Sequence, residues 1–248
     1  MALTGSGWTY TDTLTLTAST STFFSSDVGN QIFLYDNAGD IVRFTIDAYT
    51  SATIVTGRPH KTVPATLQAT NASSWAKAVD EITGLWHLEG KQVSVFADGF
   101  VAANPNNASY ETVTVSEGKI SLDKDYALVH VGLPITSDLE TLDIESFQGE
   151  TLSDKKKNVS RVTMFVESSR GIFSGTKPPV GSDNLEGLDE LKIREDESYD
   201  SSVSLRTGVV DINIRPEWNS NGRVFIRQVD PLPLSVLSIV PTGQVVVR

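Results

Sequence analysis

Short runs of alternating residues, separated by turn-forming residues, recur along the whole chain. Residues 11–17 read Thr-Asp-Thr-Leu-Thr-Leu-Thr, which places Leu14 and Leu16 on one face of an extended segment. We count roughly ten such runs, with turn signals about every 8–12 residues, a spacing typical of sandwiches and barrels. The pattern therefore predicts an all-β protein built from two or three small β-sandwich or barrel modules.

Several pairs of runs have the form of hairpins. Residues 31–47 contain two apolar runs around Asn-Ala-Gly-Asp, and Asp98-Gly99 is a two-residue turn of the type that needs positive φ. Residues 204–214 alternate cleanly, with Val210 and Ile212 on the same side. Each of these stretches is expected to pair with a neighbouring strand in an antiparallel sheet.

One segment departs from the period of two. Trp75, Val79 and Ile82 are separated by four and three residues, which is the spacing of one helical face, and Gly84 is a plausible stop. The spacing predicts one short helix over residues 73–83, with Trp75 on its buried side. A helix of this length is marginal alone and would need to pack on a sheet.

The runs and the composition between them suggest three domains. We expect a small β module over residues 1–68 and a β domain with the short helix over residues 69–147. The third domain, residues 148–248, is expected to be sandwich-like, with a long acidic loop at residues 171–200.

The charge of the chain is negative and unevenly distributed. Of a formal net charge of −11, more than half comes from residues 183–200, which carry eight acidic and two basic side chains. The only tight basic group lies within residues 155–161. The strong negative balance argues against wrapping nucleic acid, because that mode of binding needs clustered Lys and Arg.

Three interpretations of these two charged groups remain open. They are a solvated loop and turn, opposite halves of a contact between subunits, or, for the acidic group, a surface that keeps passing DNA from sticking. The candidate subunit-contact residues are Lys155, Lys156, Lys157, Arg161, Asp189, Glu190, Glu195, Asp196 and Glu197.

No catalytic constellation is recognisable. The chain has no Cys, which excludes disulfides and thiolate chemistry, and its His60, His87 and His130 lie far apart without metal-ligand spacing. Motifs of the HExxH, GxSxG and phosphate-loop types are absent. Carboxylates are abundant, but nothing selects a glycosidase pair. We therefore expect no catalytic residue, no metal and no cofactor, and a protein that is not an enzyme.

The tryptophans could serve as sugar-stacking platforms or as core residues. Trp86 lies beside Leu85 and Leu88 and, like Trp75, is expected in a core. Trp218 lies in or next to a turn and is the best candidate for an exposed aromatic. No run of about 18 apolar residues is present, so no membrane insertion is expected, and the N-terminus lacks the features of a signal peptide.

Three stretches resemble a known family. They read GLWHLEG at residues 84–90 running into VSVFADG at residues 93–99, VHVGLP at residues 129–134, and VDINIRPEWNSNG at residues 210–222, before DPLPL at residues 230–234. Together they resemble the C-terminal part of tail proteins of tailed bacteriophages, in particular the nozzle, or tail tubular, proteins of short-tailed phages. Members of that family are usually much longer than this chain.

The resemblance implies a structural protein of the virion, made in the cytoplasm of the bacterial host. Nozzle proteins form a hexameric ring at the end of the tail, next to other tail proteins, and DNA passes through it without specific binding. A second interpretation is a phage adhesin or carbohydrate-binding β module, which predicts Trp218 or Tyr110 exposed beside Asn and Asp side chains. A third, a polysaccharide-degrading enzyme, predicts two carboxylates in one cleft.

Overall fold

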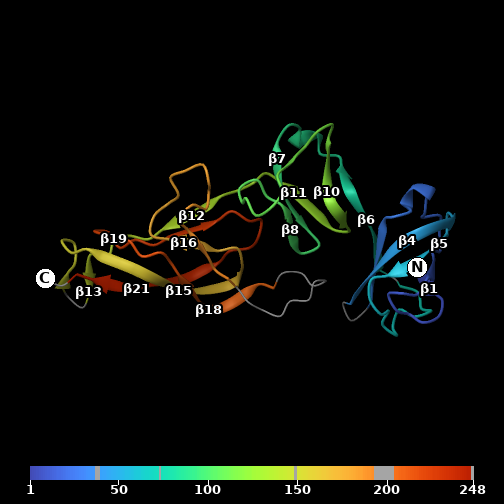
Figure 1. Cartoon of the computed structure of the whole chain (residues 1–248), viewed down its shortest axis with the longest axis horizontal. Coiled ribbons are helices and arrows are strands. Elements are labelled where there is room, and N and C mark those ends of the chain that lie inside the picture. Colours follow the sequence, from blue (N-terminus) through green and yellow to red (C-terminus); the bar gives the residue numbers. More distant parts are fainter. Residues whose placement is uncertain (37–39, 73, 148–149, 193–203, 247–248) are drawn as a thin grey trace. The chain divides into compact units, whose positions relative to one another are not determined.

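The computed structural model describes residues 1–36, 40–72, 74–147, 150–192 and 204–246. It confirms the all-β prediction, since the chain forms antiparallel strands with only two single-turn 3₁₀ helices in these ranges (Figure 1). Two compact units are present. Unit 1 comprises Met1–His87 and Ser116–His130, and unit 2 comprises Leu88–Val115 and Val131–Arg248.

Unit 1 is built on one antiparallel sheet of seven strands. In spatial order the strands are β1 (Ala2–Thr4), β2 (Leu14–Thr17), β5 (Ile54–Pro59), β4 (Ile41–Ser51), β3 (Gln31–Tyr35), β6 (Ser74–Thr83) and β10 (Lys119–Tyr126). The predicted hairpin over residues 31–47 is confirmed, because β3 and β4 pair directly from Gln31 opposite Thr45 to Tyr35 opposite Ile41.

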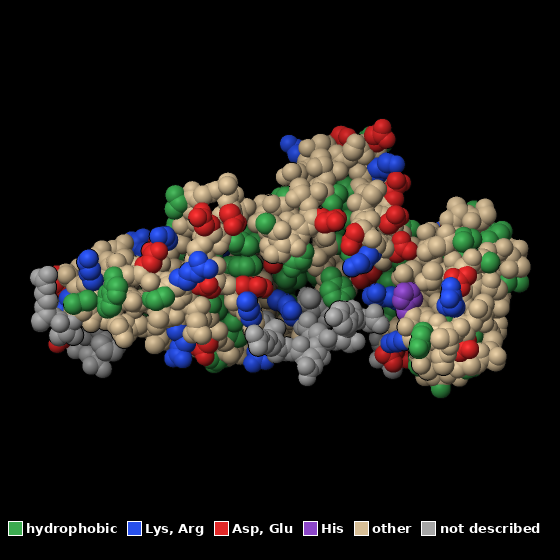
Figure 2. Space-filling model, viewed as in Figure 1, with side chains coloured by type: hydrophobic (Ala, Val, Ile, Leu, Met, Phe, Trp, Pro, Cys, Tyr) green, Lys and Arg blue, Asp and Glu red, His purple; other side chains and the backbone are tan. Residues whose placement is uncertain are grey.

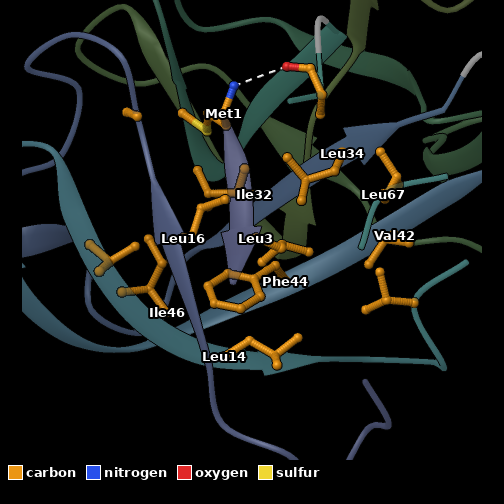
Figure 3. Close-up of a cluster of buried hydrophobic side chains, with 14 of the residues drawn as sticks. Met1, Leu3, Leu14, Leu16, Ile32, Leu34, Val42, Phe44, Ile46 and Leu67 are labelled. Atoms are coloured by element: carbon orange, nitrogen blue, oxygen red, sulfur yellow. Dashed lines mark hydrogen bonds between the residues drawn. The ribbon is translucent and has the colours of Figure 1, made fainter. Parts of the chain in front are cut away.

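The core of unit 1 follows from the alternation within its strands. Leu14 and Leu16 of β2 are fully buried, as the period of two predicts, and Phe44 of β4 and Leu34 of β3 belong to the same cluster. Figure 3 shows these side chains gathered together, with the Met1 amino group donating a hydrogen bond to the Ala72 carbonyl at 2.9 Å. Burying each large apolar side chain contributes roughly 1.5–3 kcal/mol to folding.

The prediction of a helix over residues 73–83 was wrong, because residues 74–83 form strand β6. This strand lies between β3 and β10, with Ala76 opposite Phe33 and Ile82 opposite Ile120. A segment with sheet partners on both sides satisfies its backbone hydrogen bonds in the ladder, and tertiary pairing overrides local spacing. Trp75 is accordingly 39% exposed and not part of the core.

A buried ion pair fastens β6 to the 3₁₀ turn η1 (Ser25–Asp27). The Asp27 side chain is only 3% exposed, and its carboxylate accepts hydrogen bonds from the Phe24 amide and from the Lys77 ammonium. Lys77 comes from β6, and its side chain is 30% exposed. The pair therefore neutralises a carboxylate that unit 1 holds out of water.

Replacing Lys77 tests the importance of this pair. We expect Lys77→Met to lower the free energy of unfolding by about 3 kcal/mol, because Asp27 would remain buried without its cation. Lys119→Met is the matched control, since the Lys119 pair with Glu81 is exposed to solvent and its loss should have no measurable effect. Urea denaturation of both variants would measure the difference, and equal stabilities would contradict this account.

Unit 2 contains four smaller antiparallel sheets. The first has β11 (Val129–Gly132), β7 (Gln92–Ala97) and β8 (Phe100–Ala103) in that order, with β9 (Val113–Thr114) paired to β7; of β11, only the last two residues belong to unit 2. The second has β12 (Ser137–Glu140), β20 (Phe225–Gln228), β16 (Phe173–Gly175) and β17 (Asp189–Glu190) in that order. The third pairs β13 (Ser146–Phe147) with β14 (Glu150–Thr151), and the fourth places β15 (Lys157–Ser169) between β21 (Val236–Val245) and the two strands β18 (Arg206–Asn213) and β19 (Trp218–Asn219).

The hairpin between β7 and β8 turns at Asp98 and Gly99, whose φ angles of 48° and 86° match the predicted turn. The predicted alternation of residues 204–214 is also observed. Val210 and Ile212 of β18 are buried with Val162 and Met164 of β15 in the core of unit 2.

Two features of the organisation differ from the prediction. The boundary expected at residues 68/69 is spanned by a single sheet, because β6 pairs with β3, and the two units replace the three predicted domains. The stretch 171–200 is also not one continuous loop. Phe173–Gly175 is the buried strand β16, which pairs with β17, and Leu191 belongs to the core of unit 2. Strands this short cannot be predicted from sequence periodicity, because they are fixed by pairing with segments that are distant in the chain.

In the part of the chain that the structure describes, no helix has the length and apolar character needed to cross a membrane.

Candidate functional site

The sheet around β15 has one face turned to the core and one turned to solvent. On the solvent side, which we call the outer face, Phe165 lies opposite Val209 of β18, and Thr163 lies opposite Val240 of β21. The side chains of Phe165, Val209 and Val240 are 41%, 60% and 55% exposed, although they are apolar. Leu237 of β21 is also exposed. In many proteins, neighbouring apolar side chains on one open sheet face take part in association with another chain.

Strand β21 also forms an edge of this sheet. Among the described strands it pairs only with β15, so one side of its backbone has no strand partner. Natural edge strands are commonly protected by charged side chains. Here residues 231–247 contain no charged residue, in a chain of which 21% is charged. Pro241 removes one backbone donor, and two register irregularities interrupt the ladder with β15.

The predicted basic group divides between surface and core. Arg161 and Lys156 are exposed, and Arg161 shares the solvent-facing side of β15 with Phe165. Lys155 lies 3.4 Å from a carboxylate oxygen of Glu150. Lys157 is only 3% exposed, and its ammonium donates a hydrogen bond inside the unit, to the carbonyl of Ser220. Lys157 is therefore not part of the surface of this chain, and the other three are.

The predicted acidic group is partly neutralised within the chain. Asp189 of β17 forms an ion pair with the Arg215 guanidinium at 3.8 Å and accepts a hydrogen bond from the Arg215 amide at 2.9 Å, while Glu190 is exposed. Glu195, Asp196 and Glu197 lie outside the described residues. Figure 2 shows basic side chains interspersed with acidic ones, in agreement with local ion pairs such as that between Arg227 and Asp138.

The aromatic predictions have mixed outcomes. Trp218 of β19 is 47% exposed and lies opposite Asn158 of β15. The expectation that Trp86 is buried was wrong, since it is 69% exposed on the 3₁₀ turn η2 (Trp86–Leu88). Its ring lies against Gly118, where an added Cβ would come within 2.5 Å of it. The tight fit requires glycine at that position, and the outer side of the ring remains in solvent.

A second candidate site in unit 2 is centred on a buried carboxylate. Asp230 is 8% exposed, and its Oδ1 atom accepts hydrogen bonds from the side-chain amides of Asn107 at 2.9 Å and Asn104 at 3.0 Å. Asn104, which is fully buried, also donates to the Val229 carbonyl, and its own oxygen accepts from the Ser94 hydroxyl. These bonds fasten the loop after β8 to the segment after β20.

Asp230 lies on the wall of a cavity of about 310 Å³. The lining includes polar and charged residues (Tyr110, Arg170, Glu190, Lys192 and Asp230) and apolar ones (Phe100, Val101, Leu191 and Leu232). Burial raises the pKa of Asp230, and the two amide hydrogen bonds partly oppose this shift. Burial likewise raises the pKa of Tyr110, with the charges of Asp230 and Glu190 adding to the effect.

Sequence reasoning named Tyr110 as a possible exposed aromatic beside Asn and Asp but did not identify this cavity. The stretch Asn104-Pro105-Asn106-Asn107 by itself indicates only a loop, because Asn and Pro are turn formers. Asp230 lies 123 residues after Asn107. The one available signal was an Asp preceding the apolar Pro-Leu-Pro-Leu segment, and a pairing over such a distance cannot be inferred from a single sequence.

Among the described residues, no group of three or more His, Asp and Glu side chains is placed to hold a metal ion. A scan against models of protein families finds no match to the chain, and a search of curated proteins finds no relative.

The stability of the Asp230→Asn variant should depend on pH in a defined direction. Because the pKa of Asp230 is raised in the folded chain, its carboxyl favours folding at low pH, and this contribution is lost as the pH rises through the folded-state value. Asparagine does not titrate but can still accept from Asn104 and Asn107. We therefore expect the variant, relative to the natural chain, to be more stable at pH 7 than at pH 4.

Denaturant titrations at several pH values would measure this difference. A gap between the two proteins that is constant with pH, or that moves toward the natural chain as the pH rises, would contradict the assignment of burial as the dominant influence on Asp230.

Proposed function

We propose that this chain is a structural subunit of a bacteriophage tail, which assembles with copies of itself into a ring or nozzle through which DNA is ejected. Its place would be the virion, next to other tail proteins, after synthesis in the cytoplasm of the bacterial host. Support comes from the resemblance of residues 84–99, 129–134 and 210–234 to tail nozzle proteins and from the character of the surface of unit 2.

The observation that carries the proposal is the outer face of the sheet formed by β18, β15 and β21. It exposes Phe165, Val209, Leu237 and Val240, next to an edge strand from an uncharged segment. A protein that stays monomeric would expose this surface to non-specific association. Covering it with another copy of the chain would remove the apolar side chains from water.

A ring places further demands on its subunits that this chain can meet. Ring contacts are heterologous, so two different surfaces of the subunit must match and close on rotation. The exposed charges of Lys156, Arg161 and Glu190 would then set the register between neighbours. A formal net charge of −11 would keep DNA from adhering as it passes through the ring.

Light scattering behind size exclusion tests the proposal. The natural chain is expected to show a mass near that of a hexamer of 26.9 kDa subunits, and a fall in mass with added salt would implicate the charged residues. The double variant Val209→Asp, Val240→Asp should shift the population to monomer, because each carboxylate would have to be desolvated in the contact.

Val180→Asp is the matched control, since Val180 is 89% exposed and lies between β16 and β17, outside the outer face. Circular dichroism would confirm that all variants fold. A natural chain that is monomeric at every concentration, or an oligomer that the double variant leaves intact, would refute the proposed assembly.

A further inference from the structure

A surface hollow of about 310 Å³ lies over strands β4 and β5 of unit 1. Thr45 of β4 alternates with Phe44 and Ile46, which are buried in the core, so its side chain points to the opposite face of the sheet. Arg58 of β5 lies directly opposite Thr45 in the ladder. The hollow on this face is lined by Tyr10, Thr45, Asp47, Arg58, Pro59 and His60.

Hydrogen bonds fix the polar side chains of the two strands. Arg58 donates from Nε to Asp47 Oδ2 at 2.9 Å and from Nη2 to Asp47 Oδ1 at 3.3 Å, which makes a bidentate pair. His60 Nε2 and Thr45 Oγ1 lie at a hydrogen-bond distance of 2.9 Å. Side chains that are already fixed lose little conformational entropy when a ligand binds, so the arrangement is favourable for recognition.

A tight turn holds the backbone on both sides of Tyr10. The Asp12 amide donates to the Thr9 carbonyl at 3.0 Å, and the Asp12 carboxylate accepts hydrogen bonds from the amide and the hydroxyl of Thr9 at 2.7 and 2.5 Å. Tyr10 itself is 66% exposed. The turn therefore presents an aromatic ring to solvent beside the polar groups of the two strands.

Several polar groups that line the hollow are available to a ligand. Within the described residues, the Nη1 group of Arg58, the Nδ1 atom of His60 and the hydroxyl of Tyr10 take part in no hydrogen bond. Each carboxylate oxygen of Asp47 accepts one hydrogen bond from Arg58 and has the capacity for another. The hollow thus combines donors, acceptors and an aromatic ring.

The charges of the hollow favour a neutral ligand. Because Arg58 and Asp47 are paired, a simple anion would meet the carboxylate and a simple cation would meet the guanidinium. A hydroxyl group can both donate and accept, so two neighbouring hydroxyls can accept from Arg58 and donate to Asp47 at the same time. A pyranose ring carries such hydroxyl pairs and also has an apolar C–H face, which suits the ring of Tyr10.

We propose that this hollow binds one neutral pyranose unit of a saccharide. Arg58 and Asp47 hold two neighbouring hydroxyls, His60 Nδ1 bonds a third, and the ring of Tyr10 packs on the apolar face of the sugar. A volume of about 310 Å³ is at the lower end of the range for small-molecule sites, which fits a single sugar unit. The hollow shares no residue with the outer face of unit 2, so this site is independent of the proposed ring contact.

The chain has only three histidines, which allows a site-specific test by NMR of their imidazole signals. The full chain would be titrated with methyl glucoside, methyl galactoside and methyl mannoside, and with glucuronate, glucosamine and inorganic phosphate as charged comparisons. We expect at least one methyl glycoside to shift the His60 signal and to leave those of His87 and His130 unchanged. The expected dissociation constant is on the order of 1 mM, with weaker binding of the charged probes.

Variants of the hollow should weaken the binding of that glycoside. Tyr10→Ala and Arg58→Ala are each expected to raise its dissociation constant about tenfold, the loss expected for one good contact. Asp47→Asn, which keeps the shape of the side chain, covers the case in which Arg58→Ala fails to fold. The matched controls are Phe24→Ala, which removes an aromatic ring that is also 66% exposed, and Lys119→Ala, which breaks another exposed ion pair of unit 1.

Both controls lie outside the hollow and should bind the glycoside as the natural chain does. The proposal would be overturned if no methyl glycoside shifted the His60 signal, if a charged probe bound more tightly, or if all variants bound equally well. The mass of the oligomer is measured separately and tests only the proposed assembly.

Discussion

The pairing of β15 on both of its sides is the constraint on which the rest of unit 2 depends. Its thirteen residues form ladders with β18 and β21, two strands that lie 37 or more residues further along the chain. Because side chains alternate along a strand, the same pairing that buries Val162 and Met164 must expose Phe165. The core and the candidate assembly surface are therefore two consequences of one register.

Each unit contains a buried carboxylate, and the two carboxylates differ in the groups that surround them. Asp27 in unit 1 is paired with Lys77 and hydrogen-bonded to a backbone amide, which leaves it with a structural role. Asp230 in unit 2 is held by two neutral amides on one oxygen, while its second oxygen lines a cavity. The first carboxylate is therefore neutralised by a cation, whereas burial raises the pKa of the second and neutral amides only partly oppose that shift.

The sequence predicted those parts of the fold that depend on local periodicity and turn chemistry. Leu14 and Leu16, the Asp98-Gly99 turn and the alternation of β18 could be read directly. Strand β6 could not, because its two sheet partners outweigh a spacing that favours a helix. At the candidate sites, the exposure of Trp218 could be predicted from its position beside a turn. The burial of Lys157 and the hydrogen bond from Asn107 to Asp230 could not, because both depend on contacts between distant segments.

We propose that a second copy of the chain covers the outer face of the β15 sheet, and thiol labelling tests this most directly. Because the natural sequence has no Cys, Val209→Cys and Val180→Cys each introduce a single thiol, and maleimide labelling rates can be compared at low and high protein concentration. The account predicts that both thiols react at similar rates in dilute solution and that Val209→Cys alone becomes protected as the chain assembles. Equal labelling of the two positions in the assembled protein would contradict it.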